Sequence, residues 1–387
     1  MHILQFKAMR MPLGKTLTSI ILLTVLPFLH GCGNGGTVSS EGEEVELKYA
    51  DNLSLTEFDG YTVVKVRNPW DTTRLLQTYV LVDNGMEVPS GFSKDQVINV
   101  PLKRSVIYSS VHNGLVNELG ASSAIAGVCD SEYVYEPVLK DKIRKGEIAD
   151  CGNSMSPNIE KIMSLSPGAI LLSPFENSGG HGKLSQAGIP IVECADYMET
   201  SPLARAEWMK FYGRLYGEPD KADSLFAETE RQYLELKRIA ATTTSRPKVL
   251  MDRIYGQSWN LPAGKSTMGI MIQDAGGINP FSDVKVSGSL KLSPEKVLYE
   301  AQDADIWLIR FAYTPLTLKS LGEDNKLYTQ FKAYKEGRVY GSDSSRTRIF
   351  EDVAFHPQWL LGNLIALFHP ELSLPVEGKL YFEKIKP

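Results

Sequence analysis

Two segments of the chain follow one pattern, and this repeat constrains the fold more than any other feature of the sequence. Residues 158–173 and 293–309 each begin with a residue that favours the start of a helix, and each places a glutamate two positions later, Glu160 or Glu295. A lysine and an apolar pair follow, and an apolar run typical of a buried strand comes after a short turn. An Asn or Ser side chain caps a helix, and an acidic residue in the first turn suits the positive end of the helix dipole. The repeat therefore predicts two lobes of similar build, each presenting one carboxylate at the same place.

The N-terminus has the character of a signal peptide, because basic residues precede a short apolar stretch at 17–29. This stretch is too short for a comfortable membrane span, and it ends in Leu-His-Gly-Cys, which matches the lipobox of bacterial lipoproteins. We therefore expect residues 1–31 to be a lipoprotein signal peptide, Cys32 to carry a lipid, and residues 32–47 to form a flexible tether. The alternative is an ordinary secretory signal with a chance cysteine. A lipid on Cys32 predicts an exported protein anchored on the periplasmic side of a bacterial membrane.

Charge and cysteine content narrow the possible functions. The formal net charge is −5, and the expected signal peptide contains basic residues but no acidic ones, so the mature protein is more acidic still. Such a chain is a poor candidate for binding nucleic acid or anionic lipid through bulk charge. The spacing of Cys129, Cys151 and Cys194 fits no zinc or redox motif. These residues are compatible with one disulfide and one free thiol, or with three buried thiols.

Strand and helix signals divide the mature chain into regions. Strands at 61–67 and 76–83 predict a hairpin, and strand and helix signals alternate after it, which favours parallel sheets covered on both faces. A long amphipathic helix that begins at Pro219 separates two such alternating halves. We predict an α/β fold of two Rossmann-like lobes with parallel sheets, joined by one long helix. The expected regions are an N-terminal β-hairpin extension at 48–100, an N-lobe at 101–218, the linker helix at 219–243 and a C-lobe at 244–387.

This order of segments, together with the lipobox, resembles the substrate-binding proteins of ABC importers for vitamin B12, iron–siderophores and haem. The resemblance implies that the linking helix is rigid and that a ligand is held in the cleft between the lobes, with only a small closure. It also implies that Glu160 and Glu295 dock onto arginines of a dimeric membrane permease. Carboxylates suit that role because they form charge-assisted, often bidentate hydrogen bonds with arginines. The alternative is that both glutamates only stabilise their helices through a favourable interaction with the helix dipole. The hairpin lies outside the family core. The segments that carry the resemblance are 104–120, 158–173, 183–192, 264–279 and 293–309.

Ligand contacts are expected after the carboxyl ends of the strands, where open parallel sheets bind their ligands. Aromatic side chains with a few polar groups suit a broad, partly apolar chelate. The arginines are expected to meet ligand carboxylates or an anionic siderophore, and the loop histidine to reach the ligand or a haem iron. The predicted ligand-binding residues are Ser110, Tyr133, Asn153, Phe175 and His181 in the N-lobe, and Tyr255, Trp259, Arg310, Phe311 and Arg348 in the C-lobe.

No catalytic or metal motif is complete. The Ser-x-x-Lys matches lack their partner motifs, and the histidines are too scattered for a zinc site. We therefore predict a non-enzymatic lipoprotein, with no resident cofactor or protein metal site, that carries a metal chelate (an iron–siderophore, haem or cobalamin) to an ABC permease dimer. The alternatives are a surface scavenging lipoprotein that hands its ligand to a partner outside the ABC class, and an exported serine hydrolase.

Overall fold

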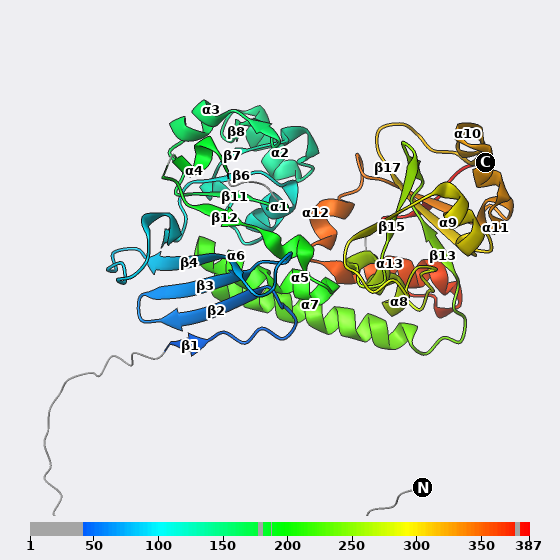
Figure 1. The fold of residues 1–387 in the computed structure, drawn as a ribbon, viewed down its shortest axis with the longest axis horizontal. Coiled ribbons are helices and arrows are strands. Elements are labelled where there is room, and N and C mark those ends of the chain that lie inside the picture. The colour runs from blue at the N-terminus through cyan, green and yellow to red at the C-terminus, as the bar shows by residue number, and fades with distance from the viewer. Residues whose placement is uncertain (1–41, 177–180, 187, 376–379) are drawn as a thin grey trace, which may run out of the picture. The chain divides into compact units, whose positions relative to one another are not determined.

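The computed structural model describes residues 42–176, 181–186, 188–375 and 380–387 (Figure 1). The chain divides into two units, residues 1–39 and 40–387, and all of the described structure belongs to the second. The expected signal peptide and lipidation residue Cys32 therefore lie outside the described residues. Within the ranges given above, no helix combines the length and the apolar character needed to cross a membrane.

The N-terminal extension is a sheet of five strands rather than an isolated hairpin. Its strands are β1 (Glu43–Glu44), β2 (Leu53–Phe58), β3 (Tyr61–Arg67), β4 (Leu75–Asp83) and β5 (Val97–Val100). They follow one another in chain order across the sheet, with β4 and β5 parallel and the other pairs antiparallel. The predicted hairpin is confirmed as β3 and β4, but the prediction missed the strands on either side of it. A lone hairpin is marginal in water, and the additional strands let this sheet bury one face.

The N-lobe contains a parallel sheet, as predicted, and this sheet has five strands, of which β8 was not predicted. Its strands are β6 (Ser105–Ile107), β7 (Ile125–Val128), β8 (Ala149–Asp150), β11 (Ala169–Leu172) and β12 (Ile191–Glu193). The order across the sheet is β12-β11-β6-β7-β8. The helices of the lobe are α1 (Ser110–Glu118), α2 (Pro137–Arg144), α3 (Ile159–Ser164) and α4 (Lys183–Gln186). A small hairpin of β9 (Gly152–Asn153) and β10 (Ser156–Pro157) precedes α3.

The C-lobe has a mixed sheet whose parallel part was predicted. This sheet has the order β13 (Val249–Met251), β17 (Ile306–Phe311), β18 (Val339–Asp343) and β19 (Glu383–Lys384), with only β19 antiparallel. A separate antiparallel sheet consists of β14 (Ile254–Tyr255), β15 (Ser258–Pro262) and β16 (Ser289–Leu292). The helices are α8 (Thr267–Asp274), α9 (Pro294–Ala301), α10 (Leu318–Asp324), α11 (Lys332–Lys335), α12 (Ile349–Val353) and α13 (Pro357–Phe368).

One long helix, α7 (Pro219–Ala240), joins the two lobes as the sequence predicted (Figure 1). It follows α5 (Pro202–Glu207) and α6 (Met209–Tyr216), and its proline at the first turn needs no backbone N–H there. Phe226 in its first half belongs to the core shared by the N-terminal sheet and the N-lobe, whereas Tyr233 and Ala240 belong to a C-lobe core. Because each half of α7 is buried in a different lobe, the helix fixes how the lobes are joined.

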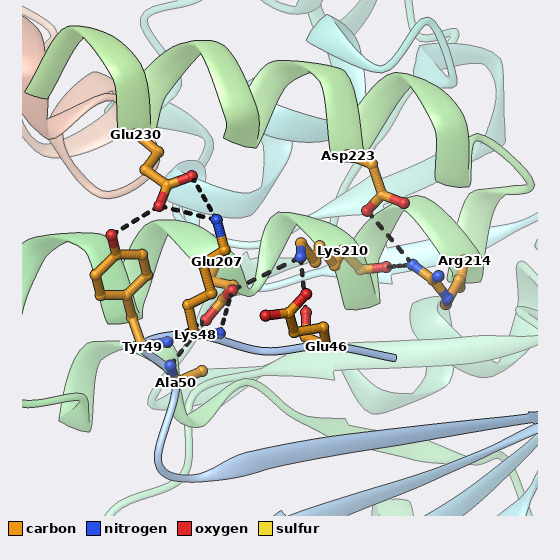
Figure 2. A network of polar contacts seen from close by, with 9 residues as sticks. All are labelled: Glu46, Lys48, Tyr49, Ala50, Glu207, Lys210, Arg214, Asp223 and Glu230. Carbon is orange, nitrogen blue, oxygen red and sulfur yellow. Dashed lines mark hydrogen bonds and ion pairs between the residues drawn. The ribbon is translucent and has the colours of Figure 1, made fainter. Parts of the chain in front are cut away.

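Two buried carboxylates attach the start of the N-terminal sheet to α5 and the turn before it. Glu207 accepts hydrogen bonds from the backbone N–H groups of residues 48, 49 and 50, at 2.8–2.9 Å (Figure 2). Glu199 accepts the next two, from residues 51 and 52, at 3.0–3.1 Å. Both acids are almost fully buried, Glu207 completely. We call residues 46–52 the strap, because their backbone holds the N-terminal sheet against the N-lobe.

Candidate functional site

A cavity of about 710 Å³ opens where the carboxyl ends of the strands of both lobes meet. In the N-lobe its wall follows β6, β7 and β11, and in the C-lobe it follows β17 and β18. This is the place where parallel α/β sheets bind ligands. Its lining residues are Tyr108, Ser109, Ser110, Val111, Asp130, Tyr133, Tyr135, Ser154, Met155, Pro157, Ile159, Leu172, Ser173, Phe175, His181, Leu184, Ala312, Tyr313, Ser344, Thr347, Arg348, Phe350 and Glu351.

Aromatic side chains dominate both walls of the cavity. Tyr133 and Phe175 of the N-lobe and Tyr313 and Phe350 of the C-lobe line it, and each is about half exposed or more. Tyr313 has a φ of 67°, a conformation that is strained for a bulky side chain and that often marks a functional position. Burial, followed by the hydrogen bond with Tyr313, raises the pKa of Tyr135 to about 12. The two walls thus offer ring faces to a broad ligand, and two tyrosines connect them.

Tyr108 contributes an unpaired hydroxyl to this wall. The side chain is 8% exposed, and its hydroxyl has no hydrogen-bond partner among the described residues. Burial, with a further contribution from Cys129 and Cys151, raises the pKa of Tyr108 far above its ordinary value. A buried polar group without a partner is costly, and this hydroxyl lies beneath the surface of the cavity wall rather than on it.

The charged groups Arg348 and Asp130 of the cavity wall already have partners within the protein. Arg348 binds Glu351 through Nε at 2.9 Å, Glu136 through Nη1 at 2.5 Å and Asp352 through Nη2 at 3.3 Å. The carboxylate of Asp130 accepts hydrogen bonds from the backbone and the hydroxyl of Ser154. The arginine therefore meets protein carboxylates on three sides, and Asp130 supports the β9–β10 hairpin beside the cavity.

Polar contacts also hold the two lobes together beside the cavity. The N–H of Tyr135 donates to Glu351 Oε1 at 2.8 Å, and His356 Nε2 of the C-lobe lies 2.7 Å from Glu118 Oε2 of the N-lobe. The ion pair between Arg348 and Glu136 is a third such contact. These contacts connect α12 and the chain around it to α1 and α2, so the cavity is bounded by elements with a defined mutual position.

The structure brings half of the predicted ligand-binding residues into the cavity wall. Ser110, Tyr133, Phe175, His181 and Arg348 all line it. The ring of His181 makes a 2.5 Å contact with Glu193, so this histidine already has a protein partner. Their direct contact with a ligand stays a prediction.

The prediction for Trp259 is corrected, because its side chain is completely buried in the C-lobe core and donates a hydrogen bond to the carbonyl of Met251 at 2.9 Å. Tyr255 is exposed on the β14–β15 hairpin and does not line the cavity. The sequence prediction assumed that the chain after β13 continues toward the cleft. Instead the chain turns at Asp252, which has a φ of 56°, and forms a separate sheet.

Three other predicted ligand residues also lie away from the cavity wall. The guanidinium of Arg310 binds the carboxylate of Asp252 at 3.1 and 2.5 Å. Phe311 is partly buried at the end of β17, one residue before the lining begins. The amide oxygen of Asn153 accepts the N–H of Met155 within the β9–β10 turn, so it shapes the hairpin that lines the cavity.

Several lining residues were absent from the predicted set. Asp130 follows the predicted strand 125–128, so the rule that ligands bind after strand ends points to it. Phe350 and Glu351 lie on α12, a five-residue helix with no clear start signal in the sequence. Met155 lies in the turn of the β9–β10 hairpin and Ile159 follows the hairpin, which is too short to be predicted.

The paired glutamates lie in matching local structures. Glu160 is exposed in the first turn of α3, where the side chain of Asn158 accepts the N–H of Lys161 at 3.0 Å. Glu295 is exposed in the first turn of α9, where Ser293 accepts the N–H of Lys296 at 3.3 Å. The predicted helix caps are confirmed, and both carboxylates are available to a partner.

Cysteine and metal chemistry add no second site in the part of the chain that the structure describes. Cys129, Cys151 and Cys194 are buried free thiols, which is one of the two arrangements that the sequence allowed. Burial raises the pKa of Cys129 to about 12 and that of Cys151 to about 11. Among the described residues there is no group of three or more His, Cys, Asp or Glu side chains arranged to hold a metal ion.

Comparison with known proteins agrees with this architecture. A model of the periplasmic binding protein family matches residues 106–345. An uncharacterized lipoprotein of Methanocaldococcus jannaschii is 28% identical over 319 residues, which cover 76% of this chain and 75% of that protein. The iron-uptake system-binding protein of Bacillus subtilis is 29% identical over 214 residues, 53% of this chain and 64% of that protein. The crystal structure of a periplasmic haem-binding protein from Pseudomonas aeruginosa has a similar fold, with a TM-score of 0.58 at 16% identity over 74% of this chain and 99% of that one.

Proposed function

The chain belongs to the periplasmic binding protein family, whose members bind solutes and are not enzymes, and we propose that it captures a metal chelate and delivers it to an ABC permease. The observation that carries this proposal is the cavity of about 710 Å³ between the strand ends of the two lobes. Its size lies within the usual range for small-molecule and cofactor sites, and aromatic faces with a few polar groups suit a broad, partly apolar chelate. The candidate chelates are iron–siderophores, haem and cobalamin.

The names of similar proteins support iron or haem as cargo. The Bacillus subtilis relative is an iron-uptake system-binding protein, and the protein from Pseudomonas aeruginosa binds haem. Isothermal titration calorimetry with a ferric siderophore, haemin and cobalamin tests the proposal. We expect saturable binding of at least one of these compounds, with one site per chain. Failure of all three to bind would remove the support for a chelate carrier.

Membrane attachment and delivery are part of the same proposal. We propose that a lipid on Cys32 anchors the exported protein, as the lipoprotein name of the Methanocaldococcus jannaschii relative suggests. Glu160 and Glu295 then dock onto arginines of the two permease subunits. Exposed carboxylates on the rigid first turns of α3 and α9 are suited to charge-assisted hydrogen bonds with such arginines.

Charge reversal separates permease delivery from scavenging for a partner outside the ABC class. In the double variant Glu160→Lys/Glu295→Lys we expect chelate uptake by cells or proteoliposomes to be lost, while chelate affinity in solution stays unchanged. The matched control is Glu300→Lys, which reverses an exposed charge on the same helix α9. Normal uptake by the double variant would instead favour a scavenging lipoprotein.

A further inference from the structure

The arginine in the cavity wall is already neutralised by the protein's own carboxylates. Arg348 is the only Lys or Arg residue among the described lining residues. Its three donor nitrogens meet Glu136, Glu351 and Asp352. A ligand anion must therefore compete with protein carboxylates for this guanidinium rather than find it free.

Two other predicted ligand contacts are also paired with carboxylates of the protein. Arg310 lies behind the Phe350 ring, 5.8 Å from its centroid, and binds Asp252. The His181 ring contacts Glu193. Lys140 on α2 is an exposed cation at the rim, 5.3 Å from the centroid of the Tyr135 ring, where water and salt screen its charge.

The remaining charges in the wall are negative. Asp130 and Glu351 line the cavity together with Arg348. Glu136 and Asp352, which pair with Arg348 behind the wall, add to this negative charge, so carboxylates outnumber the single arginine. The other hydrogen-bonding groups of the wall are neutral hydroxyls, namely those of Ser109, Ser110, Ser154, Ser173, Ser344, Thr347 and the four tyrosines.

From this arrangement we infer that the cleft selects chelates of zero or positive net charge, such as ferric trishydroxamates or corrinoids, and rejects polyanionic chelates such as ferric triscatecholates. The inference rests on the proposed function and narrows its ligand class. Two like charges about 7 Å apart at an effective dielectric constant of about 20 repel strongly enough to lower affinity by more than tenfold. Aromatic stacking and neutral hydroxyl donors, by contrast, do not discriminate against an uncharged chelate.

A charge series of iron chelates tests the inference. The probes are ferrioxamine B, which is cationic, ferrichrome, which is neutral, and ferric enterobactin, which is polyanionic. We expect the first two to bind at least about tenfold more tightly than the third in low-salt buffer, and added salt to raise the affinity for the third because it screens repulsion. Tightest binding of ferric enterobactin, with affinity that falls as salt is added, would overturn the inference and leave the proposed function standing. If these three probes, haemin and cobalamin all failed to bind, the proposed function itself would fall and the inference with it.

Substitution of Glu136, a carboxylate that pairs with Arg348, gives a second test. Glu136→Gln removes one carboxylate from Arg348, so we expect the affinity for ferric enterobactin to rise about five- to tenfold relative to that for ferrichrome. Asp303→Asn is the matched control, because it removes an exposed carboxylate that pairs with Lys248 outside the cavity wall. Equal effects of the two substitutions, or no effect of Glu136→Gln, would contradict the inferred role of the cleft carboxylates.

Discussion

Replacement of Glu207 by alanine should release the strap and destabilise the whole described structure. The carboxylate is completely buried, accepts three backbone N–H groups at 2.8–2.9 Å and lies 3.7 Å from Lys210 Nζ (Figure 2). Alanine leaves those N–H groups without an acceptor and removes the nearby carboxylate from Lys210, which keeps its hydrogen bond to the carbonyl of Glu46. The N-terminal sheet shares one core with the N-lobe, so loosening the strap exposes that core.

The size of the effect follows from the bonds that are lost. A hydrogen bond to a charged group contributes about 1.5–3 kcal/mol, but three bonds to one carboxylate do not add fully, because the strap regains water when it detaches. We therefore expect Glu207→Ala to lower the free energy of unfolding by about 3–5 kcal/mol, as when one partner of a buried charged pair is removed. Glu207→Gln keeps one acceptor oxygen and should cost roughly half as much.

Urea unfolding followed by tryptophan fluorescence measures this loss, because buried Trp208 is the next residue along the chain. Hydrogen exchange should show faster exchange of the amides of residues 48–50 in the variant. The control is Glu230→Gln, which weakens only side-chain contacts with Lys48 and Tyr49 and should cost about 1 kcal/mol or less (Figure 2). A loss below about 1 kcal/mol for Glu207→Ala would refute the reasoning.

Further predictions concern acid stability, thiol reactivity and the strained tyrosine. Burial alone raises the pKa of Asp196, but the charges and hydrogen bonds of His112 and Arg205 outweigh it and lower the pKa from 3.8 to about 2. The lowered pKa stabilises the fold fully above the unfolded pKa, and this stabilisation is lost as the pH falls through the folded pKa. Between about pH 4 and pH 2 the free energy of unfolding of the wild type should therefore fall by about 2 kcal/mol, measured by urea titration at each pH. The variant Asp196→Asn should show no such loss. Buried Cys129, Cys151 and Cys194 all have raised pKa values, so iodoacetamide at neutral pH should alkylate them only after unfolding, as read by peptide mass spectrometry; fast labelling of the folded chain would contradict their burial. Tyr313→Gly should weaken chelate binding while leaving the unfolding temperature unchanged or higher, because glycine relieves the positive φ; a fall in both would assign Tyr313 to packing.

Features set by neighbouring residues were predictable from the sequence. The helix caps at Asn158 and Ser293 depend on residues three positions away, and both are present. The amphipathic stripe of α7 depends on its own periodicity, and its predicted start at Pro219 is correct. The parallel sheet of the N-lobe followed from the alternation of strands and helices.

Features that depend on distant residues were not predictable. Glu136 is 212 residues from Arg348 in the chain, so no local pattern indicates that this arginine is neutralised. Strand β2 joins the hairpin through pairing with β3, and β1 joins through β2, and neither is strongly marked in the sequence. The burial of Trp259 follows from an inserted antiparallel sheet that redirects the chain after β13.

The most direct test of the account is to locate bound iron in a crystal of the chain grown with a ferric trishydroxamate. Anomalous difference density at the iron absorption edge should show one strong peak inside the cavity, between the wall that contains Tyr108 and the wall that contains Tyr313. An iron peak outside this cavity, or a cavity that stays empty of iron although the chelate binds in solution, would contradict the claim that the chelate is held between the two lobes.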